Sequence, residues 1–168
     1  MAAAKQKWAA LVASCGLGMA ALCGPLVMEK ESGGRQYLTP YRDIAGVWTQ
    51  CHGETLGVTA RSPRETPEGC DTKLDRRLVG YAQGVLRCVP GLKGRDEVWA
   101  SFTSMAYNIG VDAACGSTAA RRFNAGQWQA GCDAYLSWNK ARVNGVLRPV
   151  AGLTTRRRAE RELCMRKL

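Results

Sequence analysis

The sequence predicts an α+β fold in which a small N-terminal β-hairpin or sheet is followed by a mainly helical lobe, with one apolar helix before both. Three observations lead to this prediction: an uncharged stretch near the N-terminus, a glycine-rich region with a strand pattern, and helical spacing of apolar residues beyond it. A chain of 168 residues is long enough for one such domain. We therefore divide it into an N-terminal segment, residues 1–28, and a body, residues 29–168.

The N-terminal segment has the length of a membrane-spanning helix. Residues 8–28 carry no charge, and at about 1.5 Å per residue such a helix crosses the hydrocarbon core of a bilayer. Lys5 and Lys7 precede this stretch and Glu29 follows it, so the positive-inside tendency places the N-terminus in the cytoplasm and the body outside. Many alanines and glycines, together with Pro25, predict a weak anchor.

Two other interpretations of this segment remain open. A cleaved signal peptide also has an apolar stretch after positive charges, although no convincing A-x-A cleavage site precedes Glu29. Val12 to Cys15 looks like a lipobox, although the apolar stretch before Cys15 is unusually short for lipid attachment.

The cysteines predict disulfides in an oxidising compartment. Two of the eight cysteines, Cys15 and Cys23, fall in the N-terminal segment. The other six are spread along the body without CxxC or Cys/His spacing suited to zinc, so we expect neither a metal site nor a cofactor. Their order along the sequence favours the pairs Cys51–Cys70, Cys88–Cys115 and Cys132–Cys164.

The net charge favours an anionic partner. The chain has 24 Lys and Arg residues against 14 Asp and Glu, a formal charge of +10, which suits nucleic acid, acidic lipid or cell wall. Nucleic-acid binders usually interleave exposed aromatic residues with a basic stripe, whereas the tryptophans and tyrosines here fall within apolar patterns. We therefore expect no nucleic-acid partner.

Turn signals and a strand pattern predict a small hairpin at the start of the body. Gly33-Gly34 and the turn-rich stretch to Gly57 interrupt any helical period, and residues 46–49 have the composition of a short strand. A helix is predicted from Pro67 to Cys88, where apolar residues recur at helical spacing. The further predicted helices cover residues 96–108, 117–123, 127–138 and 154–166. A cleft between the sheet and the helical lobe would suit a long substrate.

Two carboxylates in the turn-rich region are candidates for glycoside hydrolysis. That reaction needs one carboxylic acid to protonate the leaving oxygen and a second carboxylate to activate or replace water. Glu31 and Asp43 are the best-placed pair. By spacing alone, the simpler interpretation is that Glu31 flanks the membrane segment and Asp43 is a turn residue.

Four sequence motifs resemble one family of enzymes. The stretch from Tyr41 to Thr55, YRDIAGVWTQCHGET, resembles the active-site hairpin of the phage-type lysozymes, glycoside hydrolase family 24. The motifs AYNIG (106–110), STAARRFNAG (117–126) and GLTTRRRAER (152–161) are similar to later motifs of the same family, in the same order. The resemblance extends from Glu31 to Cys164 and implies a lysozyme-like fold.

The resemblance also implies a catalytic glutamate, aspartate and threonine, which cut the β-1,4 bond between N-acetylmuramic acid and N-acetylglucosamine in peptidoglycan. Asp43 and Thr49 fall on the aspartate and the threonine of the family. The family's glutamate position corresponds to Gly34, so we assign the general acid to Glu31 and expect the Gly33-Gly34 turn to bring it to the site. Asp43 would be the ionised partner, and Thr49 would orient the water.

Other polar residues are candidates for smaller roles. The alternative acids are the nearest other glutamates, Glu29 and Glu54. His52 is the only histidine, and we interpret it as structural. Tyr107 and Asn108 either line the sugar cleft and bind substrate or cap the end of their helix. The run Arg156–Arg158 is interpreted as a solvated helix face that would also attract an anionic glycan.

The weak apolar segment resembles the signal-anchor-release (SAR) segments of some lysozymes in this family. Such a segment first tethers the enzyme to the inner membrane with its body in the periplasm and later leaves the bilayer, so tethering would hold Glu31 away from Asp43. In a few relatives an anchor cysteine exchanges with a body disulfide, a role open here to Cys15 or Cys23. That exchange acts at the threonine position, which remains Thr49, so we favour release as the switch.

The sequence thus predicts a monomeric endolysin that acts on peptidoglycan and is held first in the inner membrane through residues 8–28. Two alternatives belong to other functional classes. One is an inactive peptidoglycan-binding protein of the same fold, suggested by the displaced glutamate. The other is a membrane-permeabilising protein that acts through residues 8–28.

Overall fold

The computed structural model describes residues 7–43 and 46–168. The chain forms two compact units, one up to Gly80 and the other from Tyr81 to Leu168, and we describe each by itself. One helix, α4 (Pro67–Cys88), contributes residues to both units. Its apolar residues recur at helical spacing, and Leu74, Leu78 and Val85 are buried, which confirms the helix that the sequence predicts.

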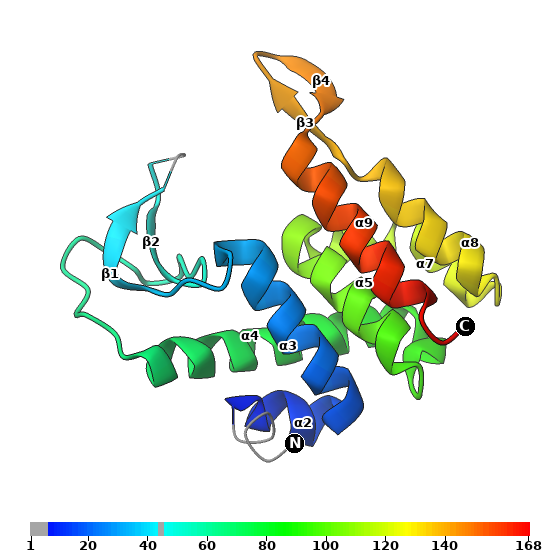
Figure 1. Cartoon of the computed structure of the whole chain (residues 1–168), viewed down its shortest axis with the longest axis horizontal. Coiled ribbons are helices and arrows are strands. Elements are labelled where there is room, and N and C mark those ends of the chain that lie inside the picture. Colours follow the sequence, from blue (N-terminus) through cyan, green and yellow to red (C-terminus); the bar gives the residue numbers. More distant parts are fainter. Residues whose placement is uncertain (1–6, 44–45) are drawn as a thin grey trace. The chain divides into compact units, whose positions relative to one another are not determined.

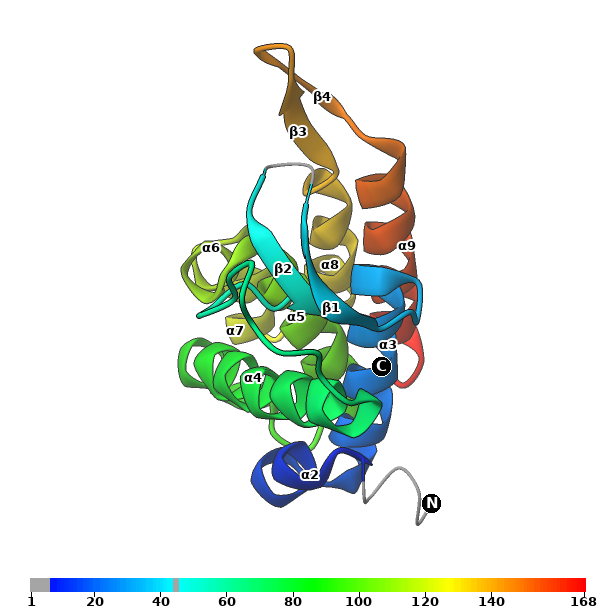
Figure 2. The ribbon, with the colours of Figure 1, turned by 90° about the vertical axis from the view of Figure 1, so that its left-hand side faces the viewer.

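The first unit combines helices with a two-stranded sheet (Figure 1). It contains α2 (Ala9–Cys15), α3 (Leu17–Ser32), β1 (Tyr37–Arg42), β2 (Trp48–Cys51) and the first part of α4. The two strands pair antiparallel, with Tyr41 opposite Thr49 and Tyr37 opposite Cys51, and the register shifts between these pairs. Figure 2 faces this hairpin, which lies where the glycine pattern predicts it.

The N-terminal segment differs from the single helix that its uncharged sequence predicts. Gly16 interrupts the helix with φ +91° and ψ 160°, a conformation that residues with a side chain rarely adopt. The chain therefore folds back, and α2 packs on α3. The indole of buried Trp8 lies against Gly24, where a Cβ atom would come within 2.3 Å of the ring.

No helix in the described part of the chain is both long enough and apolar enough to cross a bilayer. Helix α3 ends in a left-handed glycine turn, in which Gly33 has φ +58° and Gly34 has φ +76°. This is the turn that the two adjacent glycines predict. The predicted boundary between residues 28 and 29 lies inside α3, so the apolar segment and Glu31 belong to one continuous helix.

The second unit is mainly helical. It contains the end of α4 and two short 3-10 helices, η1 (Pro90–Leu92) and η2 (Ala134–Ser137). Its other helices are α5 (Asp96–Ile109), α6 (Val111–Cys115), α7 (Thr118–Asn124), α8 (Trp128–Asp133) and α9 (Ala151–Met165). Ten consecutive residues of α5, from Glu97 to Ala106, are buried. The rings of Phe102, Phe123 and Tyr135 meet beside this helix, so α5 is the centre of the core of this unit.

A second hairpin lies in a region where the sequence analysis predicts no strands. The strands β3 (Lys140–Val143) and β4 (Val146–Pro149) pair antiparallel through a turn at Asn144-Gly145. Both turn residues have positive φ, 52° and 80°, as a two-residue turn between twisted strands requires. The helix predicted over residues 127–138 is also shorter than expected, because α8 ends at Asp133 and η2 continues the chain.

Three disulfides connect the six body cysteines in the pairs that their sequence order favours. Cys51–Cys70 lies in the first unit and joins β2 to α4, with 5.0 Å between Cα atoms. Cys88–Cys115 and Cys132–Cys164 lie in the second unit, each with 5.8 Å between Cα atoms. Cys15 and Cys23 take part in none of these three disulfides, and Cys23 is buried.

We expect the Cys132–Cys164 disulfide to contribute strongly to the stability of the second unit. It connects α8 to α9 across 32 residues of sequence, and the loss of a constraint of that length costs about 3–4 kcal/mol in the chain-entropy model. Replacing both cysteines with serine should lower the free energy of unfolding by that amount in a urea titration. An unchanged midpoint would show that packing of α5, α8 and α9 alone fixes this unit.

Candidate active site

The β1–β2 hairpin places Asp43 beside Thr49. Asp43 follows the last residue of β1, and its Oδ1 accepts a hydrogen bond of 2.9 Å from the backbone N–H of Val47. Two backbone hydrogen bonds of 2.9 Å, from Asp43 to Val47 and from Gly46 to Asp43, fix the same turn. The Thr49 hydroxyl lies 3.5 Å from Asp43 Oδ2 and 3.1 Å from the Val47 carbonyl oxygen. The hairpin therefore holds one carboxylate oxygen on the backbone and directs the other toward Thr49.

Glu31 lies in the last turn of α3 and faces the turn that follows β2. Its side chain is half-buried, and Oε2 would be 3.8 Å from a Cβ atom placed on Gly53. Gly53 has φ +90°, so the chain there adopts a conformation that favours glycine. The end of α3 and the end of β2 thus come together, which brings Glu31 to the hairpin that carries Thr49.

The two alternative glutamates occupy different surroundings. Glu29 is 67% exposed and pairs with the adjacent Lys30 at 2.8 Å. Glu54 follows the β2 strand, as the resemblance predicts, and is held by two partners. Its Oε2 lies 3.3 Å from Arg77 Nη1, and its Oε1 accepts a hydrogen bond from the backbone N–H of Leu56. Glu29 therefore differs from Glu31 in its exposure, whereas Glu54 is half-buried like Glu31 but lies after β2 and is paired with Arg77 of α4.

His52 lies in a buried polar cluster next to the hairpin. Its Nε2 is 3.4 Å from Asp71 Oδ1 and 3.4 Å from the side-chain nitrogen of Gln36. Gln36 also donates to Asp71 at 2.8 Å, and Lys7 pairs with the other Asp71 oxygen at 3.0 Å. These contacts agree with a structural role. Burial lowers the pKa of His52 from its usual range, although Asp71 opposes that shift.

Tyr107 and Asn108 lie near the end of α5 in the second unit. The Tyr107 ring contacts the Tyr81 ring with 4.9 Å between centroids. Asn108 Oδ1 accepts a hydrogen bond of 3.0 Å from Arg157, and the backbone N–H of Gly110 closes the helix on the Ala106 carbonyl. The helix thus closes on its own backbone, and substrate binding by Tyr107 and Asn108 stays a prediction.

The prediction of a solvated arginine face is wrong for two of its three residues. Arg157 is 0% exposed and Arg156 is buried, whereas Arg158 is exposed. Both buried guanidinium groups meet the buried Glu160, Arg156 at 3.1 Å and Arg157 at 2.9 Å. The Ser104 hydroxyl donates to the same carboxylate at 2.7 Å. Burial raises the pKa of Glu160, and the two arginines oppose that rise.

Glu160 follows Arg156 by four residues and Arg157 by three. Side chains at these spacings meet on a helix, so the sequence contains a signal for this ion-pair cluster. Its consequence is local order, because Arg157 bridges Glu160 to Asn108 and so ties α9 to the end of α5. Across residues 7–43 and 46–168, three or more His, Cys, Asp or Glu side chains do not gather in a group able to hold a metal ion.

The geometry of Asp43 and Thr49 on a hairpin agrees with the comparison of this chain with known families. The family model described as phage lysozyme matches residues 30–160. The chain belongs to the phage lysozyme family. This match confirms the resemblance seen in the motifs, and it includes Glu31, Asp43 and Thr49 but not Glu29.

Two relatives of this phage lysozyme family member cover nearly its whole length. The SAR-endolysin of Pseudomonas phage phiKMV is 36% identical over 146 residues, which are 87% of this chain and 86% of the relative. The SAR-endolysin of Enterobacteria phage P21 is 30% identical over 160 residues, 93% of each chain.

One structural relative has been solved in two forms. The active form of the P1 phage endolysin Lyz is 25% identical, with a TM-score of 0.68 over 88% of this chain and 83% of that chain. The secreted inactive form of the same endolysin gives a TM-score of 0.52 over 85% of this chain and 93% of that chain, with 26% identity. The fold of the present chain is therefore more similar to the active form.

We expect His52 to make the stability of the protein depend on pH. Because its pKa is lowered in the folded state, the unfolded chain takes up the proton first as the pH falls, and protonation favours unfolding. The free energy of unfolding should therefore decrease as the pH falls below about 6.5, the ordinary pKa of histidine. Denaturant titrations between about pH 7.5 and pH 5 would measure this decrease.

The matched control is His52→Gln, which removes the single titrating imidazole and retains hydrogen-bonding capacity toward Asp71. The difference in unfolding free energy between the two proteins should be largest at high pH and shrink as the pH falls. A pH-independent difference would contradict the lowered pKa.

Proposed function

We propose that this phage lysozyme family member is an endolysin that hydrolyses the β-1,4 bonds between N-acetylmuramic acid and N-acetylglucosamine in peptidoglycan. The observation that supports this most directly is the Asp43 carboxylate held by the Val47 N–H beside the Thr49 hydroxyl. This arrangement lies within the family match, and both relatives are named endolysins.

The proposed mechanism gives each of the three residues one task. Glu31 protonates the glycosidic oxygen as the sugar leaves, because it is the half-buried glutamate at the end of α3. Asp43 remains ionised and either positions the attacking water or stabilises positive charge on the sugar ring. Thr49 is buried, with only 3% of its surface exposed, and its hydroxyl lies between the hairpin and the Asp43 carboxylate. A hydroxyl between the Val47 carbonyl oxygen and the Asp43 carboxylate suits a group that orients water for Asp43.

Glu31→Gln tests the assignment of the acid. The amide keeps the size of the side chain but cannot donate the proton, so lysis should fall by about 10²–10⁴-fold, the usual contribution of general acid catalysis. The fall in turbidity of chloroform-treated cells measures the rate, and mass analysis of the released fragments identifies the bond that is cut. Thermal unfolding should be unchanged.

Glu29→Gln is the matched control, because Glu29 is exposed on the same helix turn and should leave lysis unchanged. Full lytic activity of the Glu31→Gln protein would show that another group supplies the proton. If the wild-type protein binds peptidoglycan without releasing fragments, the protein is the inactive wall-binding protein suggested by the displaced glutamate.

The proposal extends to the N-terminal segment, which first holds the protein in the inner membrane and is then released into the periplasm. Residues 8–28 are uncharged, and the two relatives are SAR-endolysins. In the described structure the same residues belong to the first unit, where Leu11, Met19 and Val27 are buried. Such burial supports a segment that is retained after release, because its removal would expose the core of the unit.

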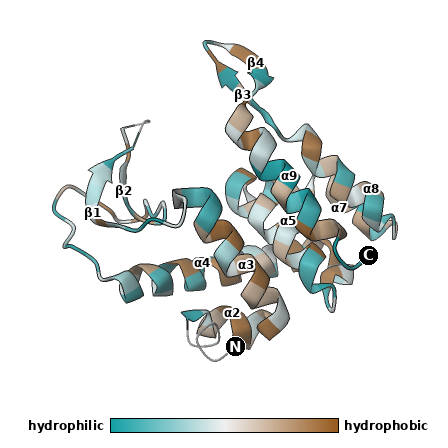
Figure 3. Cartoon of the chain, in the orientation of Figure 1, coloured by the Kyte–Doolittle hydropathy of each residue, from teal (hydrophilic) through white to brown (hydrophobic). Residues whose placement is uncertain are grey.

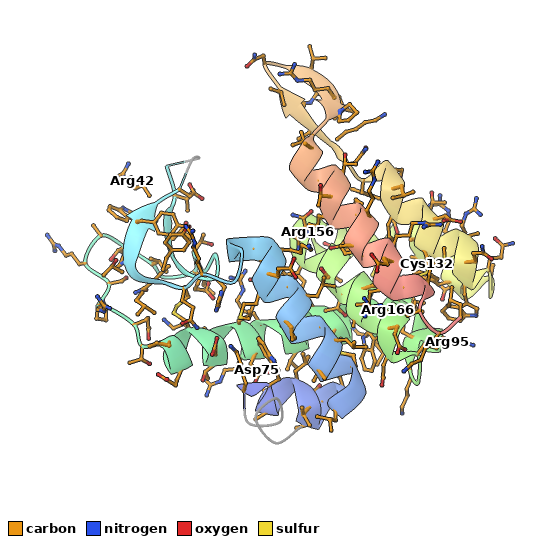
Figure 4. The ribbon with its side chains drawn as sticks, in the orientation of Figure 1. Arg42, Asp75, Arg95, Cys132, Arg156 and Arg166 are labelled. Atoms are coloured by element: carbon orange, nitrogen blue, oxygen red, sulfur yellow. A yellow bond between two sulfur atoms is a disulfide. The ribbon has the colours of Figure 1, made fainter. Side chains whose placement is uncertain are left out.

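Under this proposal, Asp75 on α4 contacts the N-terminal segment only after the segment has left the bilayer. The N–H groups of Ala10 and Leu11 lie in the first turn of α2, where a helix leaves its N–H groups without carbonyl partners of its own. They donate to Asp75 at 2.8 and 2.9 Å. Figure 4 labels Asp75 on α4. The buried carboxylate thus satisfies two free N–H groups at the start of α2, a contact that needs α2 to lie against α4 after the chain has turned back at Gly16.

The cysteines favour release over thiol exchange in this proposal. All six body cysteines are already paired with one another. Cys23 is buried, so it is not accessible for attack on a disulfide. Thr49 also occupies the position at which such an exchange would act.

Asp75→Ala should weaken the released form. It leaves the N–H groups of Ala10 and Leu11 in the first turn of α2 without their acceptor, a loss of about 1–2 kcal/mol by analogy with helix caps. The midpoint of thermal unfolding should therefore fall. In cells that express the full chain, the ratio of membrane-bound to released protein should rise about tenfold, since about 1.4 kcal/mol corresponds to a factor of ten.

Arg76→Ala is the matched control, because Arg76 is the exposed neighbour on the same helix. Equal membrane fractions in the two variants would show that Asp75 does not select between the membrane-bound and the released protein. Lysis that persists in an Asp43→Asn protein would instead support permeabilisation of the membrane by residues 8–28.

A further inference from the structure

The β3–β4 hairpin of the second unit carries exposed apolar residues next to exposed cations. Val146 and Leu147 are 63% and 60% exposed. The exposed cations of the hairpin are Lys140, Arg142 and Arg148. In both views the hairpin extends away from α8 and α9 of its own unit (Figures 1 and 2).

The register of the hairpin brings both kinds of residue to its tip. Arg142 is paired with Leu147, Arg148 with Ala141, and Val143 with Val146, so each face combines an arginine with an aliphatic side chain. Arg142 also donates to the Gly145 carbonyl at 3.0 Å, which stabilises the turn. Figure 3 shows hydrophilic and hydrophobic residues next to one another on this hairpin.

The charge around the hairpin is of one sign. The sequence has no acidic residue between Asp133 and Glu160, and Glu160 is buried with Arg156 and Arg157. Arg158, in the second turn of α9, adds another exposed cation. An anionic surface would therefore meet no like charge along this stretch.

We infer that the β3–β4 hairpin binds the surface of an anionic phospholipid membrane. Arginine and lysine side chains interact with lipid phosphates, while Val146 and Leu147 enter the boundary between headgroups and acyl chains. A glycan fits this surface less well, because residues 140–149 include no aromatic side chain to stack on a sugar and the aliphatic tip would gain nothing from a hydrated polymer.

Vesicle binding by the full chain tests this inference. The probes are vesicles of phosphatidylglycerol mixed with phosphatidylcholine, and vesicles of phosphatidylcholine alone. Each cation near an anionic surface strengthens binding about fivefold, so the triple variant Lys140→Gln, Arg142→Gln, Arg148→Gln should bind the anionic vesicles about 100-fold more weakly. Residues 8–28 are unchanged in all variants, so their own contribution to binding is the same.

The charge-matched control is Arg61→Gln, Arg76→Gln, Lys93→Gln, which removes three exposed cations outside the hairpin. It should bind at least tenfold more tightly than the hairpin variant. Val146→Ser with Leu147→Ser should weaken binding to the anionic vesicles about tenfold while the net charge stays the same. Circular dichroism and thermal unfolding verify that each variant is folded.

Equal vesicle binding by the hairpin variant and its control would overturn the inference. So would a hairpin variant that binds vesicles normally but sediments less with purified peptidoglycan sacculi, because the partner would then be the wall. Neither measurement uses hydrolysis, so a protein without lytic activity can still support or contradict the lipid site.

Discussion

The fold of the first unit depends on the contact between the Asp75 carboxylate and the first turn of α2. That carboxylate accepts the N–H groups of Ala10 and Leu11 and so holds α2 on α4. Helix α2 in turn packs on α3, where the Trp8 ring occupies the space above Gly24. Because α3 continues without interruption to Ser32, the same contacts determine where Glu31 lies. The apolar segment and the proposed acid Glu31 therefore belong to one helix, so a change in the position of the segment also moves Glu31.

Because the apolar segment and Glu31 share helix α3, the proposed release gives a physical reason why the tethered enzyme would be inactive. A helix that remained in a bilayer through residue 28 would hold Glu31 within one turn of the membrane surface. In the described structure Glu31 instead reaches the Gly53 turn, next to the hairpin of Asp43 and Thr49. No rearrangement of disulfides is needed, because the three bridges connect only body cysteines.

The sequence could predict features that depend on local patterns. Helical spacing predicted the helix from Pro67 to Cys88, and sequence order predicted the three disulfides. It could not predict the partner of Ala10, because Asp75 is 65 residues away and an uncharged run gives no sign of a break at Gly16. Burial of Arg157 likewise depends on how α9 packs against α5. The second hairpin was predictable, since Asn144-Gly145 between short apolar runs is a strong turn signal.

The weakness of the proposed anchor follows from what the folded unit requires of the same residues. Gly16 must adopt a positive φ, and the Trp8 ring leaves no space for a side chain at position 24, which is Gly24. Each glycine contributes less to membrane insertion than a leucine would, so positions that allow the two-helix fold also lower the hold on the bilayer. The proposed release further requires Lys5 and Lys7 to cross the membrane, and each lysine at the bilayer centre costs about 2.5–3.5 kcal/mol, which is a barrier to release. The ion pair of Lys7 with Asp71 and the two N–H groups bound by Asp75 form only after that crossing and stabilise the end state. Under the proposed release, the body of the enzyme thus supplies, on α4, interactions that stabilise the released state.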